Sequence, residues 1–171
     1  MDKLDKLYEL CEENGIVVET VTLMPSLLGL YTKMEGYPPI ITLNKIILGD
    51  KKKTLEVFSE ELGHHFTTDG NFVGVLTHYT DRISLDSMEL KALKWACNFL
   101  IPDSELIKNL GNETNLYDLA EVLEVPYPML MSKLNFIKKD KGYIKFGDKT
   151  LYLYSNDNLL YHESLIWCIL I

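Results

Sequence analysis

The chain has 171 residues, which is enough for one compact domain with an apolar core, and we expect a single domain over residues 1–171. With 47% hydrophobic and 25% charged residues, the composition is typical of a soluble globular protein. The net charge of −8 argues against a surface devoted to duplex DNA, because phosphate contacts need a basic face.

The cysteines and the apolar segments predict a cytoplasmic protein. Cys11, Cys97 and Cys168 are far apart and lack metal-finger spacing, so we expect reduced thiols. The N-terminus lacks the apolar stretch of a signal peptide. No apolar run approaches the ~20 residues that a membrane span needs, so we expect no membrane partner.

The first part of the chain is predicted to form a helix and a small antiparallel sheet. Helical spacing of leucines and a stop at Gly15 predict a helix over 2–14. The β-branched run 16–23 predicts a strand. Residues 27–44 predict two strands around a turn, with Pro38 and Pro39 placing the second at an edge.

Two longer helices are predicted next. Residues 51–68 form the first, with a core face made of Leu55, Phe58, Leu62 and Phe66. Residues 84–102 form the second, capped by Asp86 or Ser87 and followed by Pro102. Its apolar stripe consists of Leu90, Leu93, Ala96 and Cys97.

The last part of the chain predicts two short helices and a hairpin. The helices cover 115–125 and 127–139, and the hairpin covers 142–155 with its turn at Gly147-Asp148. The order helix, small sheet, helices, hairpin predicts an α+β fold, with a core over 4–137 and a C-terminal hairpin region over 138–171.

The stretch "EELGH" carries the strongest chemical signal. On a helix, Glu60 and His64 point in directions only about 40° apart, which lets both bind one metal ion. Glu61 lies beside this pair, where a carboxylate can serve as a base. Gly63 weakens the helix by roughly 1 kcal/mol relative to alanine, so we expect a neighbour to pack closely there. A third ligand must come from another element, and Glu89 on the next helix is the candidate.

Together, "EELGHHFTTDG" and "ELKALKWACNFLIP" resemble the ImmA/IrrE family of metallopeptidases. That family has a HELGH-type helix, followed by a helix with the pattern E-x-x-A-x-x-[FW]-A-x-x-[FL]-L-x-P. The second pattern is matched by Glu89, Ala92, Trp95, Ala96, Leu100 and Pro102. The strands before the first helix and the segment "LAEVLEVPYPML" also resemble the family, so the likeness covers roughly residues 4–137.

The resemblance implies a gluzincin-like domain and a role for each site residue. His64 matches a histidine ligand, Glu61 the general base and Glu89 the glutamate ligand. Glu60 stands where the family has its first histidine ligand. A carboxylate can bind zinc, but Glu60 and Glu89 together cancel the charge of a divalent ion, so the ion would polarise a carbonyl less strongly. We expect one divalent ion, with zinc favoured and manganese as an alternative.

The expected function is that of a metal-dependent endopeptidase. The resemblance implies a protein substrate, a helix–turn–helix repressor of a prophage, mobile element or stress response. Three alternatives stay open. The first is a decayed metal site. The second is an inactive family member that acts as an anti-repressor by contact. The third, a nucleic-acid-binding regulator using 116–149, is disfavoured by the acidic charge and by a helix whose only early basic residue is Lys133.

Several residues are weaker candidates. His65 is expected beside the site and not among the ligands. His78 and Tyr79 could donate to a developing oxyanion, although surface positions are the simpler interpretation. His162 is expected to be an ordinary histidine, and Trp95 and Phe99 are expected in the core.

Overall fold

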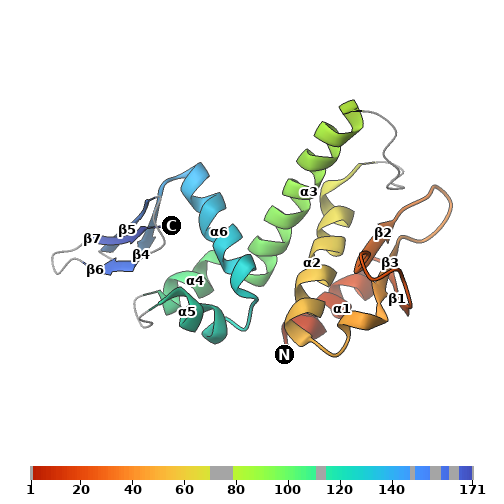
Figure 1. Ribbon diagram of the computed structural model, residues 1–171, viewed down its shortest axis with the longest axis horizontal. Coiled ribbons are helices and arrows are strands. Elements are labelled where there is room, and N and C mark those ends of the chain that lie inside the picture. Colours follow the sequence, from red (N-terminus) through yellow and green to blue (C-terminus); the bar gives the residue numbers. More distant parts are fainter. Residues whose placement is uncertain are drawn as a thin grey trace. The chain divides into compact units, whose positions relative to one another are not determined.

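The computed structural model describes residues 2–69, 79–110, 115–146, 149–154, 159–161 and 166–170. The chain divides into two compact units, Met1–Ala96 and Cys97–Ile171 (Figure 1). The boundary lies inside a helix, which is why no linker marks it in the sequence.

Two helices of the first unit form where the sequence predicted them. Helix α1 spans Lys3–Glu13 and begins with a capping box, in which Asp2 and Asp5 each accept a hydrogen bond from the other's backbone N–H. Helix α2 spans Lys51–Thr67, and the Asp50 side chain caps it by accepting from the Lys53 N–H.

The sheet of the first unit has the strand order β1-β3-β2, formed by Val17–Val21, Ile40–Asn44 and Gly29–Thr32 respectively. The predicted pairing of β2 with β3 is confirmed as antiparallel. Two expectations are wrong. Strand β1 pairs in parallel with β3, so the sheet is mixed, and β3 is the central strand. The prolines precede β3 and remove no hydrogen bond from its ladder.

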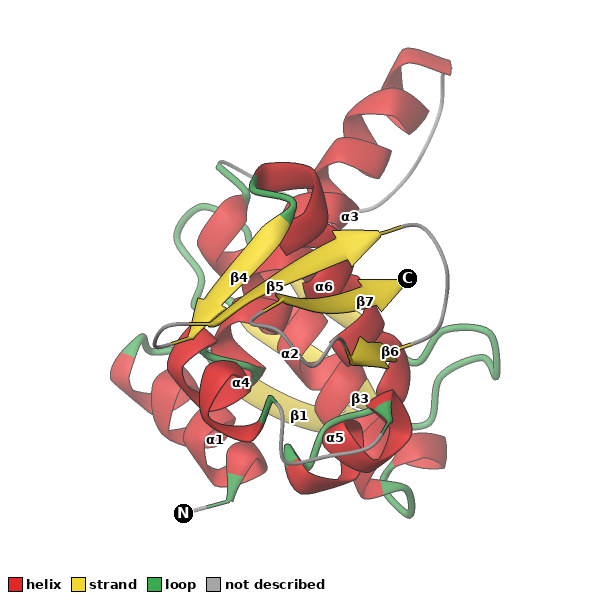
Figure 2. Ribbon diagram, turned by 90° about the vertical axis from the view of Figure 1, so that its left-hand side faces the viewer, coloured by secondary structure: helices red, strands yellow, loops and turns green. Residues whose placement is uncertain are grey.

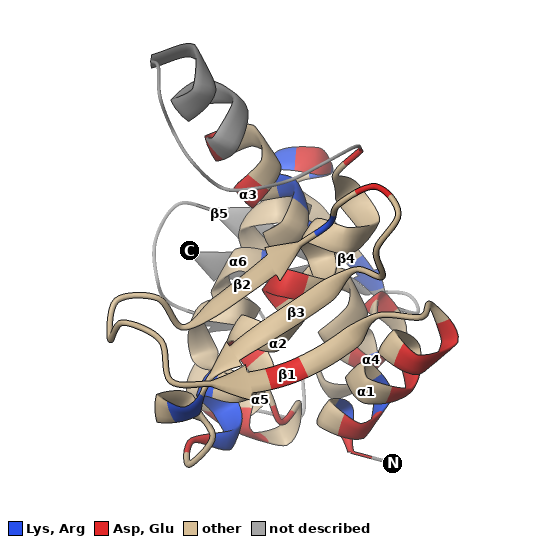
Figure 3. Ribbon diagram, turned by 90° about the vertical axis from the view of Figure 1, so that its right-hand side faces the viewer, with Lys and Arg blue, Asp and Glu red and all other residues tan. Residues whose placement is uncertain are grey.

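One face of this sheet lies against α2 (Figure 3). A 3-10 turn at Lys45–Ile47 leads from β3 toward α2. The core between these elements is made of Leu7, Cys11, Tyr31, Ile41, Leu43, Leu55, Phe58 and Leu62. Phe66 was predicted on this face, but its side chain is 39% exposed because it turns to stack on Trp95 instead.

Helix α3 spans Tyr79–Leu100 and begins earlier than predicted. Asp86 and Ser87 therefore lie inside the helix and do not cap it, since no glycine or proline interrupts residues 79–86. Leu90, expected in the apolar stripe, is 50% exposed, whereas Ala92 and Ala96 are buried. Pro102 follows the end of the helix as predicted.

The second unit contains three further helices and a four-stranded sheet. Helix α4 spans Asp103–Asn109, α5 spans Leu116–Val122 and α6 spans Tyr127–Asp140. Their packed residues include Leu106, Leu119, Leu123, Met129, Leu130 and Leu134. Lys133 is buried as well, so it is not available on an exposed face of α6.

The C-terminal sheet has the order β4-β5-β7-β6 (Figure 2). The predicted hairpin is confirmed by the antiparallel pair of Tyr143–Phe146 (β4) and Lys149–Tyr154 (β5), although its turn residues 147–148 lie outside the described ranges. Strand β7, Ile166–Leu170, pairs in parallel with β5 and antiparallel with β6, Leu159–Tyr161.

The fold class is α+β, as predicted. In the part of the chain that the structure describes, no helix is both long and apolar enough to cross a membrane.

Candidate functional site

Helix α2 carries the predicted site residues on two adjoining faces. Glu60, Gly63 and His64 lie on the face that meets α3. Glu61 and His65 lie on the face that meets β2. The helical period produces this division, because positions 60 and 64 follow one line along the helix and positions 61 and 65 follow the next.

The close approach of α2 to α3 depends on Gly63. A Cβ added at Gly63 would overlap the backbone carbonyl of Ala92. The prediction that a neighbour packs closely here is therefore confirmed. Ala92 lies three residues after Glu89, about one turn along α3. The contact of Gly63 with Ala92 therefore also fixes which turn of α2 lies opposite Glu89.

His64 and Glu89 meet across this contact. His64 Nε2 donates a hydrogen bond to Glu89 Oε2 over 3.2 Å, with the His64 side chain 6% exposed and that of Glu89 54% exposed. Burial acts to lower the pKa of His64, but the hydrogen bond to Glu89 and the charges of Glu89, Glu61 and Glu60 together raise it. The acidic surroundings thus favour a positive charge at this position.

Glu60 lies near the same pair, in an acidic pocket of about 240 Å³ lined by Glu60, Asp86, Glu89, Leu90 and Leu93. Burial, followed by the charge of Glu56, raises the pKa of Glu60 to about 7. A half-buried carboxylate with acidic neighbours is costly to ionise, and a bound cation would reduce that cost.

Glu61 occupies a different environment beneath β2. Its carboxylate lies directly under the backbone of Gly29 and accepts a hydrogen bond from the Tyr31 backbone N–H. Burial is the main cause that raises the pKa of Glu61 to about 7, and His64 partly opposes the rise. A carboxylate with a pKa near 7 can both accept and release a proton at neutral pH.

These residues match a divalent ion in donor chemistry and, in part, in spacing. Two ligands of a tetrahedral zinc ion at about 2.0–2.2 Å lie roughly 3.3 Å apart, close to the His64–Glu89 separation. Within the described ranges, however, no three histidine, cysteine, aspartate or glutamate side chains are grouped so that they could hold one ion. His64 and Glu89 are therefore brought together, whereas Glu60 would have to turn toward them to complete a set of three.

His65 and its neighbours form an aromatic row beside the site. The Tyr31 hydroxyl lies 3.0 Å from His65 Nδ1, and the His65 ring packs edge-on against Phe66. Phe66 stacks on Trp95 with ring centroids 4.8 Å apart, so Trp95, predicted in the core, is half-buried. Phe99 is half-buried too. His78 and His162 lie outside the described residues, and Tyr79 is described only in its backbone.

Sequence reasoning missed Gly29, Tyr31 and Asp86. A glycine inside a strand pattern is a known sign of close backbone approach, so "LGLYT" contained a usable signal for Gly29. Asp86 was assigned to a helix cap because the helix was predicted to begin too late. Tyr31 contributes to the site through its backbone N–H, which no sequence pattern reveals.

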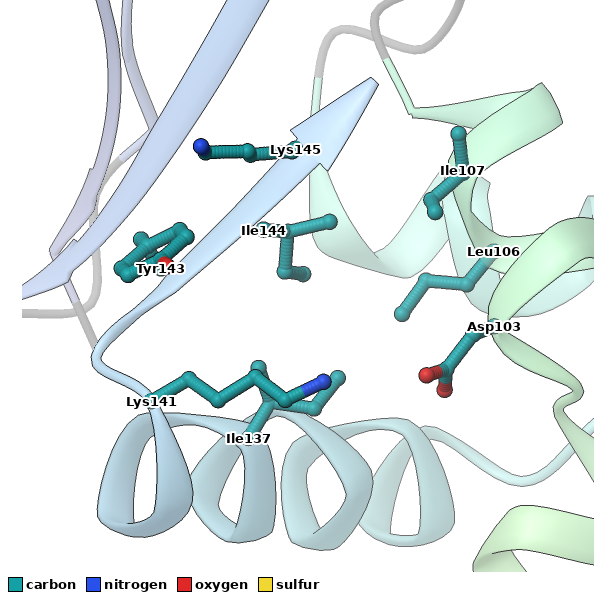
Figure 4. Close-up of a pocket in the computed structure, with 8 residues that line it drawn as sticks. All are labelled: Asp103, Leu106, Ile107, Ile137, Lys141, Tyr143, Ile144 and Lys145. Atoms are coloured by element: carbon teal, nitrogen blue, oxygen red, sulfur yellow. The ribbon is translucent and has the colours of Figure 1, made fainter.

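A second cavity lies within the second unit, between α4, α6 and β4 (Figure 4). It measures about 290 Å³, and its apolar lining consists of Leu106, Ile107, Ile137 and Ile144. Its one carboxylate, Asp103, accepts from the buried Lys133 ammonium over 2.5 Å, and Lys133 also donates to Asn98 over 2.7 Å. The rest of the lining consists of Lys141, Tyr143 and Lys145.

Comparisons of the chain with protein-family models, with curated proteins and with solved structures each gave no match.

Proposed function

We propose that the first unit carries a gluzincin-like, metal-dependent endopeptidase centre made of Glu60, Glu61, His64 and Glu89. The meeting of His64 with Glu89 is the observation that supports this most directly. These residues are 25 positions apart in the chain, and a three-ligand site on these helices requires their contact.

Each residue has a distinct part in the proposed reaction. His64, Glu89 and Glu60 would hold the ion, which when bound supplies positive charge to polarise the peptide carbonyl. Glu61 would take a proton from the attacking water and pass it to the leaving amine. The pKa of Glu61 is about 7 in the metal-free protein, and a bound ion would lower it, which favours the ionised carboxylate that accepts the proton of the water.

The position of β2 supports a peptide substrate. It is the edge strand of the sheet, so one side of its main chain is not paired within the sheet. An extended peptide can add to such an edge through main-chain hydrogen bonds. A peptide bound there would pass Glu61, which lies under Gly29 of the same strand.

The proposed substrate is a helix–turn–helix repressor, as the resemblance to the ImmA/IrrE family implies. Cleavage would release the genes of a prophage, mobile element or stress response. The departure at Glu60 makes the centre less positive than one with two histidines, so we propose a slower enzyme than a HELGH-type relative.

The test of this function is the Glu61→Gln variant. It removes the base and keeps the shape of the side chain, so the protein should keep its fold and its metal and lose cleavage of the repressor. Glu12→Gln, the same change at an exposed position on α1, is the matched control and should cleave normally. Equal cleavage by wild type and Glu61→Gln would refute the assigned role.

A second candidate function is binding by contact alone. It is favoured by the lack of a three-donor group among the described side chains, and on this hypothesis the His64–Glu89 hydrogen bond serves to join the two helices. On this hypothesis the protein would bind its repressor equally well with and without chelator. Under the peptidase hypothesis, chelator abolishes turnover.

A further inference from the structure

We propose that Gly29 is a positioning residue for Glu61: the missing side chain at this point of β2 leaves the space that the Glu61 carboxylate occupies. The inference rests on the proposed function only in the role that it gives to Glu61. The placement itself is a matter of packing between β2 and α2.

The packing above Glu61 leaves no room for a side chain at Gly29. A Cβ added there would lie 2.6 Å from Val57 Cγ1, 2.7 Å from Glu61 Oε1 and 2.8 Å from Glu61 Cγ. Cβ atoms in proteins essentially never approach other heavy atoms within 3.0 Å. Any larger residue at position 29 must therefore move Val57, Glu61 or the strand.

Backbone conformation does not explain this glycine. Among the described residues, the left-handed φ that favours glycine is found at Gly15, Gly36 and Gly142, together with Glu124, and not at Gly29. Alanine could adopt the Gly29 backbone without strain. Its methyl group, however, would overlap the side chains of Val57 and Glu61 on α2.

A hydrogen bond from β2 holds Glu61 on a second side. The Leu28 carbonyl accepts from the Asn44 N–H of β3, so the main-chain groups of Leu28 face the sheet. Main-chain groups alternate along a strand, which places those of Gly29 and Tyr31 on the side of β2 that faces away from β3. The Tyr31 N–H donates to the Glu61 carboxylate from that side.

Glu61 is thus held at the β2 edge of the sheet by the space at Gly29 and by the N–H of Tyr31. Of the two α2 side chains above which Gly29 lies, Val57 is stiff at χ1 and Glu61 is flexible. Alanine at position 29 would therefore displace Glu61 more readily than Val57. The base would leave the edge along which a peptide lies.

The experiment is a set of thermal unfolding measurements on the full chain. Gly29→Ala is introduced into wild type, into Val57→Ala and into Val57→Ala/Glu61→Ala. Val57→Ala removes the nearest other clash, so Val57→Ala/Gly29→Ala should fold even if Gly29→Ala alone does not. We expect Gly29→Ala to lower the Tm of the Val57→Ala protein, and to lower the Tm of the Val57→Ala/Glu61→Ala protein by clearly less, because no α2 side chain then meets the added methyl group.

A functional readout separates positioning from packing. In the Val57→Ala background, Gly29→Ala should lower kcat toward a quenched fluorogenic peptide pool at least tenfold, with KM and bound zinc unchanged. The carboxyl ¹³C resonance of Glu61 should shift in the same variant. If Gly29→Ala lowers the Tm equally with and without Glu61, or leaves that resonance unmoved, the inference is wrong. The Tm difference and the shift of the Glu61 resonance could both appear although wild type cleaves no peptide. In that case Gly29 positions Glu61, and the proposed peptidase function fails.

Discussion

His64 on α2 and Glu89 on α3 are joined by a 3.2 Å hydrogen bond between Nε2 and Oε2. The same nitrogen must lose its proton to bind a metal ion, so a proton and an ion compete for this pair of atoms. Because the surrounding carboxylates raise the pKa of His64, the proton is held to a higher pH than in a free histidine.

The stability of the metal-free protein should fall as pH rises. The pKa values of Glu60 and Glu61 are about 7 in the folded protein, against an ordinary value of 4.5. Between pH 4.5 and pH 7 the folded state binds more protons than the unfolded state. The two raised pKa values therefore add to the free energy of unfolding below pH 4.5, and this contribution is lost as the pH rises through 7. The raised pKa of His64 acts in the same direction, and the lowered pKa of His65, caused mainly by burial, opposes it.

Thermal unfolding in chelator checks this expectation. The Tm should be lower at pH 8 than at pH 5.5, and Glu60→Gln/Glu61→Gln should lose most of that difference. Zinc added at pH 8 should restore the Tm of wild type. A double variant with the same pH dependence as wild type would show that these carboxyls are not the cause.

Gly63→Ala should destabilise the protein by separating α2 from α3. Overpacking of this kind costs about 1–3 kcal/mol, and the better helix propensity of alanine returns roughly 1 kcal/mol. Gly49→Ala is the control, because an added Cβ at Gly49 meets nothing within 4 Å. Urea unfolding should show a loss for Gly63→Ala and little change for Gly49→Ala. A Gly63→Ala protein of wild-type stability would contradict the close contact with Ala92.

Glu60→His should strengthen zinc binding. The change raises the charge of the bound centre by one and replaces an oxygen donor with an imidazole, which suits zinc better than manganese. Competition with a chromophoric chelator should show zinc affinity rising more than manganese affinity. If neither wild type nor Glu60→His binds zinc, position 60 is not a ligand position and the site is a decayed one.

In the second unit, Asp103→Ala should destabilise the protein more than Lys133→Met. Removing Asp103 leaves the buried Lys133 ammonium without its carboxylate, although Asn98 still accepts a hydrogen bond. Because Asp103 is largely exposed, we expect a loss of about 2 kcal/mol, which is less than for a fully buried pair. Lys133→Met replaces the buried charge with an apolar chain and should change stability by less than about 1 kcal/mol. Chemical unfolding of both variants gives the comparison.

Helical periodicity and stop signals predicted most elements of the fold. The apolar spacing in 51–68 and the glycine after residue 14 each gave a helix close to its observed bounds, and the proline at 102 marked the end of α3 but not its start. The parallel pairing of β1 with β3 could not be predicted, because pairing direction depends on how the chain returns and not on the strand sequence.

The candidate site was predicted in its residues but not in its surroundings. Spacing within one helix placed Glu60 and His64 together, and the need for another ligand led to Glu89. The space under Gly29 and the hydrogen bond from the Tyr31 backbone depend on how β2 lies on α2. The exposed position of Phe66 was mispredicted for a similar reason, since its partner Trp95 is on another helix.

The proposed metal centre is tested most directly by the zinc content of the protein purified without chelator and dialysed against zinc-free buffer. We predict about one zinc per chain in wild type, and little in His64→Ala and in Glu89→Gln. Lys91→Ala, an exposed change two residues from Glu89, should keep the wild-type content. The proposed metal site is refuted if wild type holds no divalent metal, or if Glu89→Gln holds as much as wild type.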